Sequence, residues 1–374
     1  IHAPHPVAVD RVDFSGIQDE SHREAEALKR VTADARRPFD LTQGPLLRVT
    51  LLKLAPSEHV LLLCMHHIIS DGWSMGVLVR EVTSLYGAFH AGQPVSLPEL
   101  PVQYADYAVW QRGWLQGDAL NQQFSFWKEQ LAGAPHALEL PTDKPRPAFL
   151  STRGASVPVQ LSLAHSQGVE TLAQKEGVTP FMVLLAAYHM LLNRYSAQDD
   201  VLVGSPIAGR HHAQTESLIG FFVNTLVLRA RFGRELTFRQ LLAQVRDTTL
   251  GAYEYQDLPV ERLVEELQVE RDPSRTPLFQ TLFTLQNAPI PELVLPGLTV
   301  RPADGEDTGV ALFELSLDLF RGADGFSGTL NYSTDLYEEA TAQRLASHYQ
   351  RLLEGVLARP DERVAALPMM PSLI

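Results

Sequence analysis

The alternation of apolar and polar positions near the start of the chain predicts a β-hairpin followed by a helix. Residues 46–53 and 59–65 form apolar, β-prone runs joined by the short segment Leu-Ala-Pro-Ser-Glu. This pattern is typical of two antiparallel strands. From Val77 to Phe89 apolar residues recur with helical spacing, which indicates an amphipathic helix that Asp71 or Ser74 could cap.

The same order of elements recurs near the end of the chain. Residues 313–320 and 326–332 read as a second hairpin, followed by a loop with an aspartate and an amphipathic helix over 340–353. The recurrence indicates a duplicated lobe. Where the first copy has paired histidines at 66 and 67, the second has Leu-Asn-Tyr at 330–332. We therefore expect a single active site, belonging to the first copy and lying between the lobes.

Between the two hairpins, helical and strand-like patterns mix. An aromatic helix is predicted from Tyr104 to Trp114 and on through residues 124–131, and strand-like runs cover 201–210 and 219–232. The helix after Thr179 is apolar nearly all round and should be buried, with His189 as a satisfied core histidine.

The mixture lacks strict βα alternation, which favours α+β lobes with mixed sheets. A Gly- and Pro-rich stretch over 91–102 marks a lobe boundary.

Composition narrows the class of protein. A chain of 374 residues is long enough for two domains, and its net charge of −13 disfavours general nucleic-acid binding. The single cysteine, Cys64, cannot form an internal disulfide, which fits a reducing compartment. No apolar run is long enough to span a membrane and no signal peptide is evident, so the sequence predicts a cytoplasmic protein without membrane contact.

Two catalytic patterns overlap in residues 60–76. The first reads Gly72-x-Ser74-x-Gly76 as a nucleophile elbow, which needs a strand running straight into the turn, an upstream oxyanion loop and a later histidine. Here the apolar strand stops several residues earlier, no such loop precedes it, and the later histidine, His348, falls within a predicted helix. The pattern therefore favours Ser74 as the start of a helix rather than as a nucleophile.

The second pattern is His66-His67-x-x-x-Asp71-Gly72. Adjacent residues at a strand end point to opposite faces, so one histidine can enter a cleft while the other anchors the loop. A neutral imidazole suits proton transfer near neutral pH. Asp71 can fix the turn, and Gly72 permits close backbone approach or positive φ. The diverging histidines do not form a metal site, but two merely structural histidines remain an equal alternative on spacing alone.

The rest of the chain decides between these alternatives. The histidine segment and four further segments, in the same order, resemble the condensation domain of non-ribosomal peptide synthetases. The matching segments are residues 65–74, 104–110, 219–226, 255–261 and 271–280.

The resemblance implies two lobes of chloramphenicol-acetyltransferase-like fold in a V-shaped pseudo-dimer. On this resemblance we expect the N-terminal lobe to cover 1–97 and to lack its first segment, and the C-terminal lobe to cover 98–374. It also implies peptide-bond formation: an acceptor amine attacks a donor thioester in a tunnel between the lobes, and the thiol leaves.

The resemblance assigns roles residue by residue. His67 matches the active-site histidine, as a base or a positioning group, and the N–H of Gly72 faces the reacting carbonyl. His66 and Asp71 match structural members of the motif, with Arg210 as the partner of Asp71. Residues that could line the tunnel, or equally be plain core or strand residues, are Trp73, Asn224 and Gln286.

No directly bound cofactor is expected, because the family's substrates ride on phosphopantetheine arms of carrier proteins. The implied partners are donor and acceptor carrier domains and neighbouring synthetase modules. The intact histidine pair and the segment after Gly72 differ from heterocyclising and epimerising relatives, which favours an L-configured donor. The alternatives are an acyltransferase that delivers a carrier-bound acyl group to a soluble amine or alcohol, and a non-catalytic recruitment module.

Overall fold

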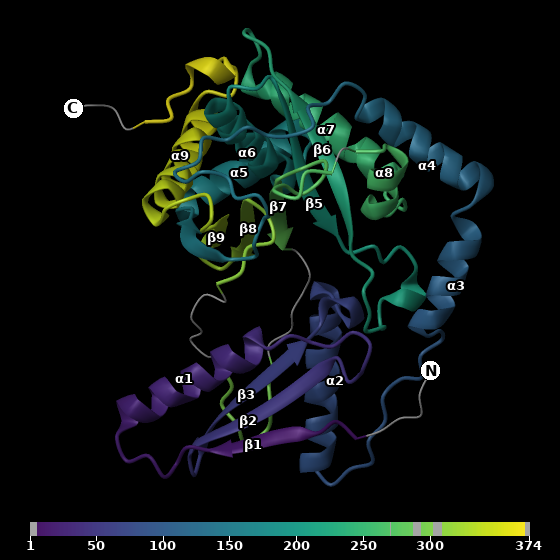
Figure 1. Cartoon of the computed structure of the whole chain (residues 1–374), viewed down its shortest axis with the longest axis vertical. Helices are drawn as coiled ribbons and strands as arrows, with labels where there is room; N and C mark the ends of the chain where they lie inside the picture. The colour runs from purple at the N-terminus through teal and green to yellow at the C-terminus, as the bar shows by residue number, and fades with distance from the viewer. Residues whose placement is uncertain (1–5, 270, 287–292, 302–308, 371–374) are drawn as a thin grey trace. The chain divides into compact units, whose positions relative to one another are not determined.

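The computed structural model describes residues 6–269, 271–286, 293–301 and 309–370, so residues 1–5, where the predicted N-terminal lobe starts, lie outside the described residues. The chain forms two compact units (Figure 1). The first unit comprises Ile1–Ala108, Arg210–Phe222 and Ala288–Thr308, and the remaining segments form the second unit. The predicted division between residues 97 and 98 is a single cut, whereas each of these units contains several segments of the chain.

The first unit contains a three-stranded sheet in the order β1-β2-β3. β1 (Val9–Asp13) is parallel to β2 (Leu47–Ala55), which forms an antiparallel hairpin with β3 (Glu58–Met65). The predicted hairpin is therefore confirmed. Helix α1 (Glu20–Arg36) packs on β2 and β3, and α2 (Gly72–His90) follows the hairpin.

The buried apolar core of the first unit is small. Its one cluster of contacting buried residues among the described residues is Ala27, Leu52 and Leu54, with partly buried residues packed around them, and Val77, Leu218 and Phe222 are buried elsewhere in this unit. On β3 the side chain of Leu61 remains 52% exposed. Most of the hydrophobic stabilisation of the chain therefore lies in the second unit.

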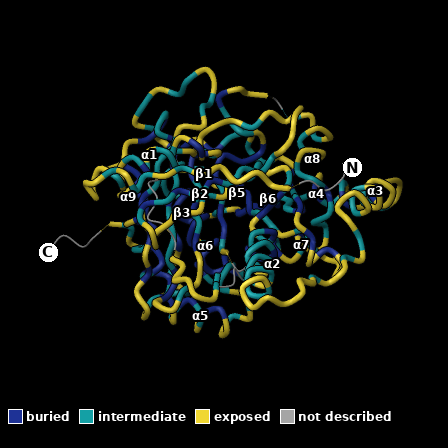
Figure 2. Tube along the Cα trace, turned by 90° about the horizontal axis from the view of Figure 1, so that it is seen from below, coloured by how far each residue is buried: buried dark blue, intermediate teal, exposed yellow. Residues whose placement is uncertain are grey.

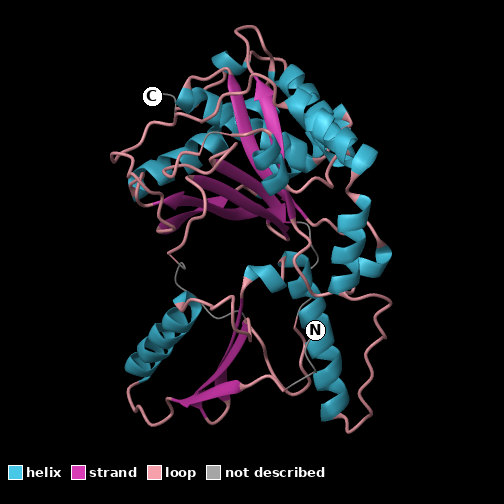
Figure 3. Cartoon of the chain, turned by 45° about the vertical axis from the view of Figure 1, so that its right-hand side comes forward, coloured by secondary structure: helices cyan, strands magenta, loops and turns pink. Residues whose placement is uncertain are grey.

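The second unit is built on a six-stranded mixed sheet in the order β4-β9-β8-β7-β5-β6 (Figure 3). Its strands are β4 (Gly154–Gln160), β5 (Asp200–Ile207), β6 (Asn224–Arg231), β7 (Thr281–Gln286), β8 (Leu315–Gly322) and β9 (Gly325–Ser333). Its helices are α4 (Gly117–Gln130), α5 (Leu163–Glu176), α6 (Pro180–Ser196), α7 (Phe238–Glu254), α8 (Val260–Glu266) and α9 (Glu339–Ala358). The chain first passes from the first unit to the second within α3 (Tyr104–Trp114).

Helix α6 lies at the centre of the second unit, where it contacts α5, α7 and α9 and packs on β5 and β7. Thr179 caps it, and every residue over 182–192 is buried. Figure 2 colours buried positions of the chain dark blue. His189 is fully buried and its Nε2 lies 3.1 Å from the Leu228 carbonyl oxygen. Burial lowers the pKa of His189 to about 4, so the ring is neutral at pH 7. The predicted core position of His189 is confirmed, but only Nε2 is satisfied, because the buried Nδ1 has no hydrogen-bond partner in the described part of the chain.

Two predicted elements differ from the structure. The aromatic helix is not continuous, because Gln116 is extended and Gly117 has a φ of 54°, a conformation that glycine adopts without strain. α3 and α4 are therefore separate helices. The strand predicted over 219–232 begins only at Asn224, since the backbone before it bonds to side chains rather than to a neighbouring strand.

The predicted repeat is present in the order of the elements. Before α2, a strand pairs parallel with the first strand of a hairpin, and β7-β8-β9 repeats this arrangement before α9. The hydrogen bonds correct the equivalence inferred from sequence. The N–H of His66 donates to Leu46 O and that of Ser333 donates to Glu314 O, both at 3.0 Å. The counterparts of His66 and His67 are therefore Ser333 and Thr334, not residues 330–332.

Candidate active site

The histidine motif forms a short loop between β3 and α2. β3 ends at Met65, residues His67–Ile69 form one turn of 3-10 helix, and α2 begins at Gly72. Of the two predicted caps, Asp71 is the one used, because its Oδ1 accepts the N–H of Ser74 at 2.9 Å. Both histidines thus lie beyond the strand, and their different surroundings come from the turn rather than from strand alternation.

His66 stabilises the turn from within. Its Nδ1 accepts the backbone N–H of Ile68 at 3.0 Å, so in this bond Nδ1 carries the lone pair and the proton of the neutral ring is on Nε2. The ring of Phe39 meets it edge-on, with centroids 6.0 Å apart. His66 is therefore held as a structural member of the loop.

His67 has the opposite tautomer. Its Nδ1 lies 2.7 Å from the carbonyl oxygen of Ser70, and because a carbonyl only accepts, Nδ1 must donate. The lone pair of the neutral ring is then on Nε2. The residue is exposed, and Phe221 packs edge-on against its ring with centroids 5.0 Å apart. His67 thus presents a proton-accepting nitrogen from an exposed position on the loop.

Asp71 is buried and fully engaged. Besides capping α2, its carboxylate accepts the Ser74 hydroxyl at 2.7 Å, the Phe222 N–H at 3.0 Å and Arg210 Nη2 at 3.0 Å. Burial on its own would raise the pKa of Asp71, but the hydrogen bonds and the charge of Arg210 outweigh it and hold the pKa below its usual value. Asp71 is therefore an anion at neutral pH.

Arg210 brings a distant part of the chain to this loop. Its side chain is 1% exposed and that of Asp71 is 3% exposed. Nη1 donates to Leu218 O at 2.8 Å and to Thr215 O, and the guanidinium lies 4.0 Å from the centroid of the Phe222 ring. Burial lowers the pKa of Arg210, whereas Asp71 raises it and keeps the charged form favourable. The structure brings Asp71 and Arg210 together as a buried ion pair.

Ser74 lies in the first turn of α2 and is completely buried. Its Oγ lies 2.8 Å from Arg210 Nη2 and 3.1 Å from the Gly220 N–H, both of which donate to it. The hydroxyl proton points towards Asp71 Oδ1 or the Gly220 carbonyl, at 2.7 and 3.0 Å. One donor and two lone pairs are thus all in use, and the exposed hydroxyl that a nucleophile elbow requires is absent at Ser74.

Gly72 and Trp73, the next two residues after Asp71, lie in the first turn of α2. Gly72 is exposed and is the first residue of α2, so its backbone is helical and the predicted alternative of a positive φ does not apply. The indole N–H of Trp73 donates to Glu216 O at 2.9 Å, which fastens the 210–222 segment to α2.

Asn224 and Gln286 belong to the second unit. The Nδ2 of Asn224 donates to the carbonyls of Gln256 and Leu258, both at 2.8 Å. Its Oδ1 accepts the N–H groups of Thr225 at 2.8 Å and of residue 260 at 3.1 Å. The amide of Asn224 is therefore a clasp between β6 and the segment before α8, whereas Gln286 is the exposed last residue of β7.

Sequence reasoning missed the residues that hold the 210–222 segment. Ser74 and Asp71 bond the backbone at Gly220 and Phe222, and the Tyr104 hydroxyl donates to Phe221 O at 2.8 Å. Tyr104 and the 220–222 tripeptide lie in two of the matching segments, which the resemblance marks as motifs without giving roles to these positions. Their place in those segments is the one signal that could have found them.

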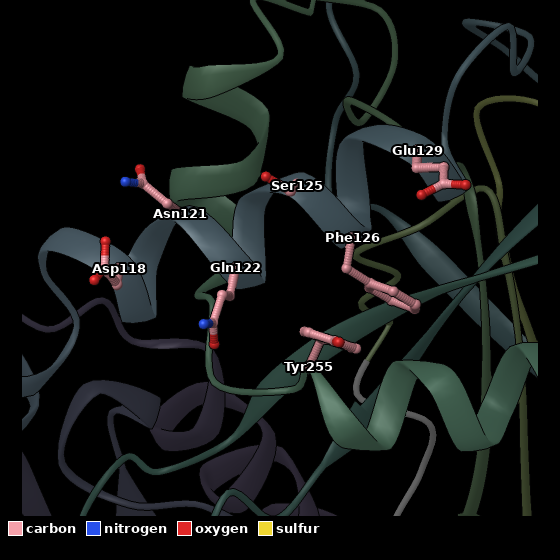
Figure 4. Close-up of a pocket in the computed structure, with 7 residues that line it drawn as sticks. All are labelled: Asp118, Asn121, Gln122, Ser125, Phe126, Glu129 and Tyr255. Atoms are coloured by element: carbon pink, nitrogen blue, oxygen red, sulfur yellow. The ribbon is translucent and has the colours of Figure 1, made fainter.

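A separate cavity of about 440 Å³ opens on α4 in the second unit (Figure 4). The stacked rings of Phe126 and Tyr255, with centroids 4.2 Å apart, form part of its wall. Its other lining residues are Asp118, Asn121, Gln122, Ser125 and Glu129. None of the predicted site residues lines this cavity.

The described part of the chain holds no cluster of three or more His, Cys, Asp or Glu side chains suited to a metal ion. Among the helices it contains, none is both long and apolar enough to cross a membrane.

Comparison with known proteins gives consistent matches. One subunit of linear gramicidin synthase from Brevibacillus parabrevis is 49% identical over 352 residues, which are 94% of this chain and 4% of that protein. Malpibaldin synthetase of Mortierella alpina is 45% identical over 358 residues, which are 95% of this chain and 6% of that protein. The chain therefore spans only a small part of the length of the curated relatives that it matches.

Two solved structures extend the likeness to the fold. The four-domain nonribosomal peptide synthetase holo-AB3403 matches with a TM-score of 0.85 at 25% identity, covering 99% of this chain and 28% of that one. The X-domain in its complex with OxyB from teicoplanin biosynthesis has a TM-score of 0.85 at 29% identity, covering 99% of this chain and 80% of that one.

The sequence profile described as "Condensation domain" matches residues 1–373. With these relatives, the match shows that the chain belongs to the condensation-domain family.

Proposed function

We propose that this chain catalyses peptide-bond formation between a donor and an acceptor carried as thioesters by carrier domains. The observation that supports this most directly is the tautomer of His67. Its Nδ1–H is committed to Ser70 O, so Nε2 is available to accept a proton. Family membership and the similarity to peptide synthetases support the substrate class.

The chemistry follows from the atoms at the loop. The acceptor nitrogen attacks the donor carbonyl carbon and forms the new C–N bond, while the carbonyl oxygen becomes an oxyanion. His67 Nε2 takes the proton that the nitrogen loses, the C–S bond breaks, and the proton passes to the departing thiolate. His67 is then neutral again and ready for another cycle.

We propose that the N–H of Gly72 stabilises the oxyanion. As the first residue of α2, its N–H has no partner within the helix, and the helix dipole favours negative charge there. A hydrogen bond that strengthens as the oxyanion forms lowers the barrier.

We extend the proposal to carrier domains and neighbouring synthetase modules as partners, with the reacting groups delivered on phosphopantetheine, and to an L-configured donor. Contact of Trp73 and Gln286 with substrate belongs to the same proposal.

The test is His67→Asn, because the amide of asparagine can replace Nδ1 at Ser70 O while Nε2 is lost. We expect transfer between loaded donor and acceptor carrier domains to fall by about 10²- to 10⁴-fold, with thermal unfolding unchanged. His66→Asn is the matched control: it sits one residue earlier, and we expect a smaller loss of activity that follows the loss of stability. Undiminished product formation by His67→Asn would refute the proposed role.

A second candidate is a recruitment module. The complex of the X-domain with OxyB shows a protein of this fold assembled with another protein. If this chain acts in that way, His67→Asn will leave its contribution to product assembly intact, whereas surface substitutions that release the partner will abolish it.

A further inference from the structure

We propose that Phe221 is a positioning residue that holds the imidazole of His67 in its productive orientation. This inference rests on the proposed role of His67. The two rings meet at 89° with centroids 5.0 Å apart. Edge-to-face contact is one of the preferred arrangements of aromatic rings.

His67 needs such support because it is exposed. Water competes for the bond between Nδ1 and Ser70 O, and an imidazole in water can rotate about both of its side-chain bonds. A half-turn of the ring would replace Nδ1 by a carbon at the carbonyl and redirect the proton-accepting nitrogen. The phenyl group occupies one side of the ring, restricts this rotation and keeps water from that side.

The backbone around Phe221 is in turn fixed by three side-chain hydrogen bonds. Ser74 Oγ accepts the N–H of Gly220, Tyr104 donates to the carbonyl of Phe221, and Asp71 accepts the N–H of Phe222. These bonds fix the backbone immediately before, at and after Phe221. The orientation of an exposed histidine is thus set through a segment that two buried side chains, Ser74 and Asp71, and the more exposed Tyr104 hold in place.

The close fit of the segment also depends on Gly220. A Cβ at this position would lie 2.4 Å from Tyr104 Cδ2 and 3.0 Å from Phe222 Cε2. Gly220 lets Tyr104 approach closely enough to bond to the carbonyl of Phe221. Glycine before Phe221 is therefore part of the same device.

The molecule supplies its own control. Phe39 meets the ring of His66 at the same angle of 89°, with centroids 6.0 Å apart. The two pairs share a residue type and a geometry, but Phe39 contacts the histidine whose Nδ1 is used within the loop. Removing each phenyl group in turn separates positioning of His67 from general packing.

The experiment compares Phe221→Leu, Phe221→Tyr and Phe39→Leu in the full chain supplied with loaded donor and acceptor carrier domains. Leucine keeps apolar bulk without a ring, and tyrosine keeps the ring. We expect Phe221→Leu to lower kcat by about fivefold with little change in KM for the acceptor carrier. Phe221→Tyr should recover most of this loss, and Phe39→Leu should leave kcat unchanged.

The independent readout is ¹⁵N NMR of the histidine rings at about pH 8.5, two units above the usual histidine pKa, with His67 assigned from its missing signal in His67→Asn. In the unaltered chain Nδ1 of His67 should be protonated and Nε2 unprotonated, and Phe221→Leu should mix the tautomers.

Unchanged ring signals in Phe221→Leu would overturn the inference, whatever happens to kcat. Mixed tautomers together with full activity in His67→Asn would retain Phe221 as a positioning residue and refute the proposed function instead.

Discussion

Two loops of the chain join a β-hairpin to a helix. Their backbones form matching hydrogen bonds, but their side chains differ. In the first, His66 and His67 follow β3 and Asp71 caps α2; in the second, Ser333 and Thr334 follow β9 and Glu338 precedes α9. The turn bonds also repeat, from Ile69 N to His66 O and from Leu336 N to Ser333 O, both at 3.1 Å.

The acidic residues at the two N-cap positions have different roles. Asp71 caps its own helix and forms a buried ion pair, whereas the side chain of Glu338 caps nothing and pairs with Lys144 at 3.1 Å near the surface. Instead, Asp143 from a distant segment accepts the Glu338 N–H at 2.8 Å and the Thr341 hydroxyl at 2.9 Å.

The comparison separates geometry from function. The hairpin and the helix fix the length and path of the loop in both places. What distinguishes the first loop is its pair of histidines and the 210–222 segment, which Asp71 and Ser74 hold beside His67. The arrangement proposed to be reactive is therefore added to a loop whose backbone path also occurs elsewhere in the chain without it.

The largest expected effect comes from neutralising the acidic residue at the N-cap position of each helix. Asp71→Asn leaves Arg210 as a buried, unpaired charge and should lower the free energy of unfolding by about 3–5 kcal/mol. Glu338→Gln removes only a surface pair and should cost no more than about 1 kcal/mol. Urea unfolding at pH 7 measures both, and equal losses would contradict the distinction between the loops.

Acid should reduce the difference in the free energy of unfolding between wild type and Asp71→Asn. Because the pKa of folded Asp71 lies below its unfolded value of about 3.9, the unfolded chain takes up this proton first as the pH falls. The stability that Asp71 provides is thus complete above the unfolded pKa and is lost as the pH falls through the folded one. Urea unfolding at pH 7 and at about pH 3 should show the gap shrinking; a gap that stays constant would mean that the charge of Asp71 contributes nothing.

Gly220→Ala tests how far the first loop depends on the close fit of the 210–222 segment. The added Cβ would lie 2.4 Å from Tyr104 Cδ2, so the tripeptide must shift, at a cost of about 1–3 kcal/mol together with a loss of activity. Gly113→Ala in α3 is the control, because nothing lies within 4 Å of its Cβ position. We expect that control to be neutral or slightly stabilising in thermal unfolding. If the two variants behave alike, the close fit at Gly220 has no energetic weight.

The smallest expected effect comes from giving the second loop a side-chain cap. Glu338 has φ and ψ of −88° and 155°, which suit an N-cap, but its side chain is too long for the role. Glu338→Asp should therefore give α9 a cap like that of α2 and raise the free energy of unfolding by about 0.5–1 kcal/mol. Thermal unfolding detects this gain, and Glu338→Ala serves as the uncapped reference.

Periodicity predicted the elements that are amphipathic or wholly apolar over many residues. The two hairpins, α2, α6 and α9 follow from it, because burial of one face or of all faces imposes a repeating pattern. The break at Gln116 and Gly117 did not appear, since aromatic and apolar residues continue on both sides of it.

The site could be predicted only in part. The motif resemblance indicated His67, Asp71 and Arg210, and the structure places all three in the first unit. The hydroxyl bonds of Ser74 to Gly220 join residues 146 positions apart, and no local pattern carries such a contact. The predicted path of residues 219–223 was wrong for the same reason, because β-prone residues there bond to side chains instead of a strand.

The clasp at Asn224 has a consequence for recombining this chain with its relatives. Its amide joins the start of β6 to residues 256, 258 and 260. The matching segments 219–226 and 255–261, which look independent in the sequence, are therefore held together by hydrogen bonds. A chimaera with a crossover between residues 224 and 260 would take the two hydrogen-bonded segments from different parents. Crossovers placed outside this interval keep both segments from one parent and should give the better-folded hybrids.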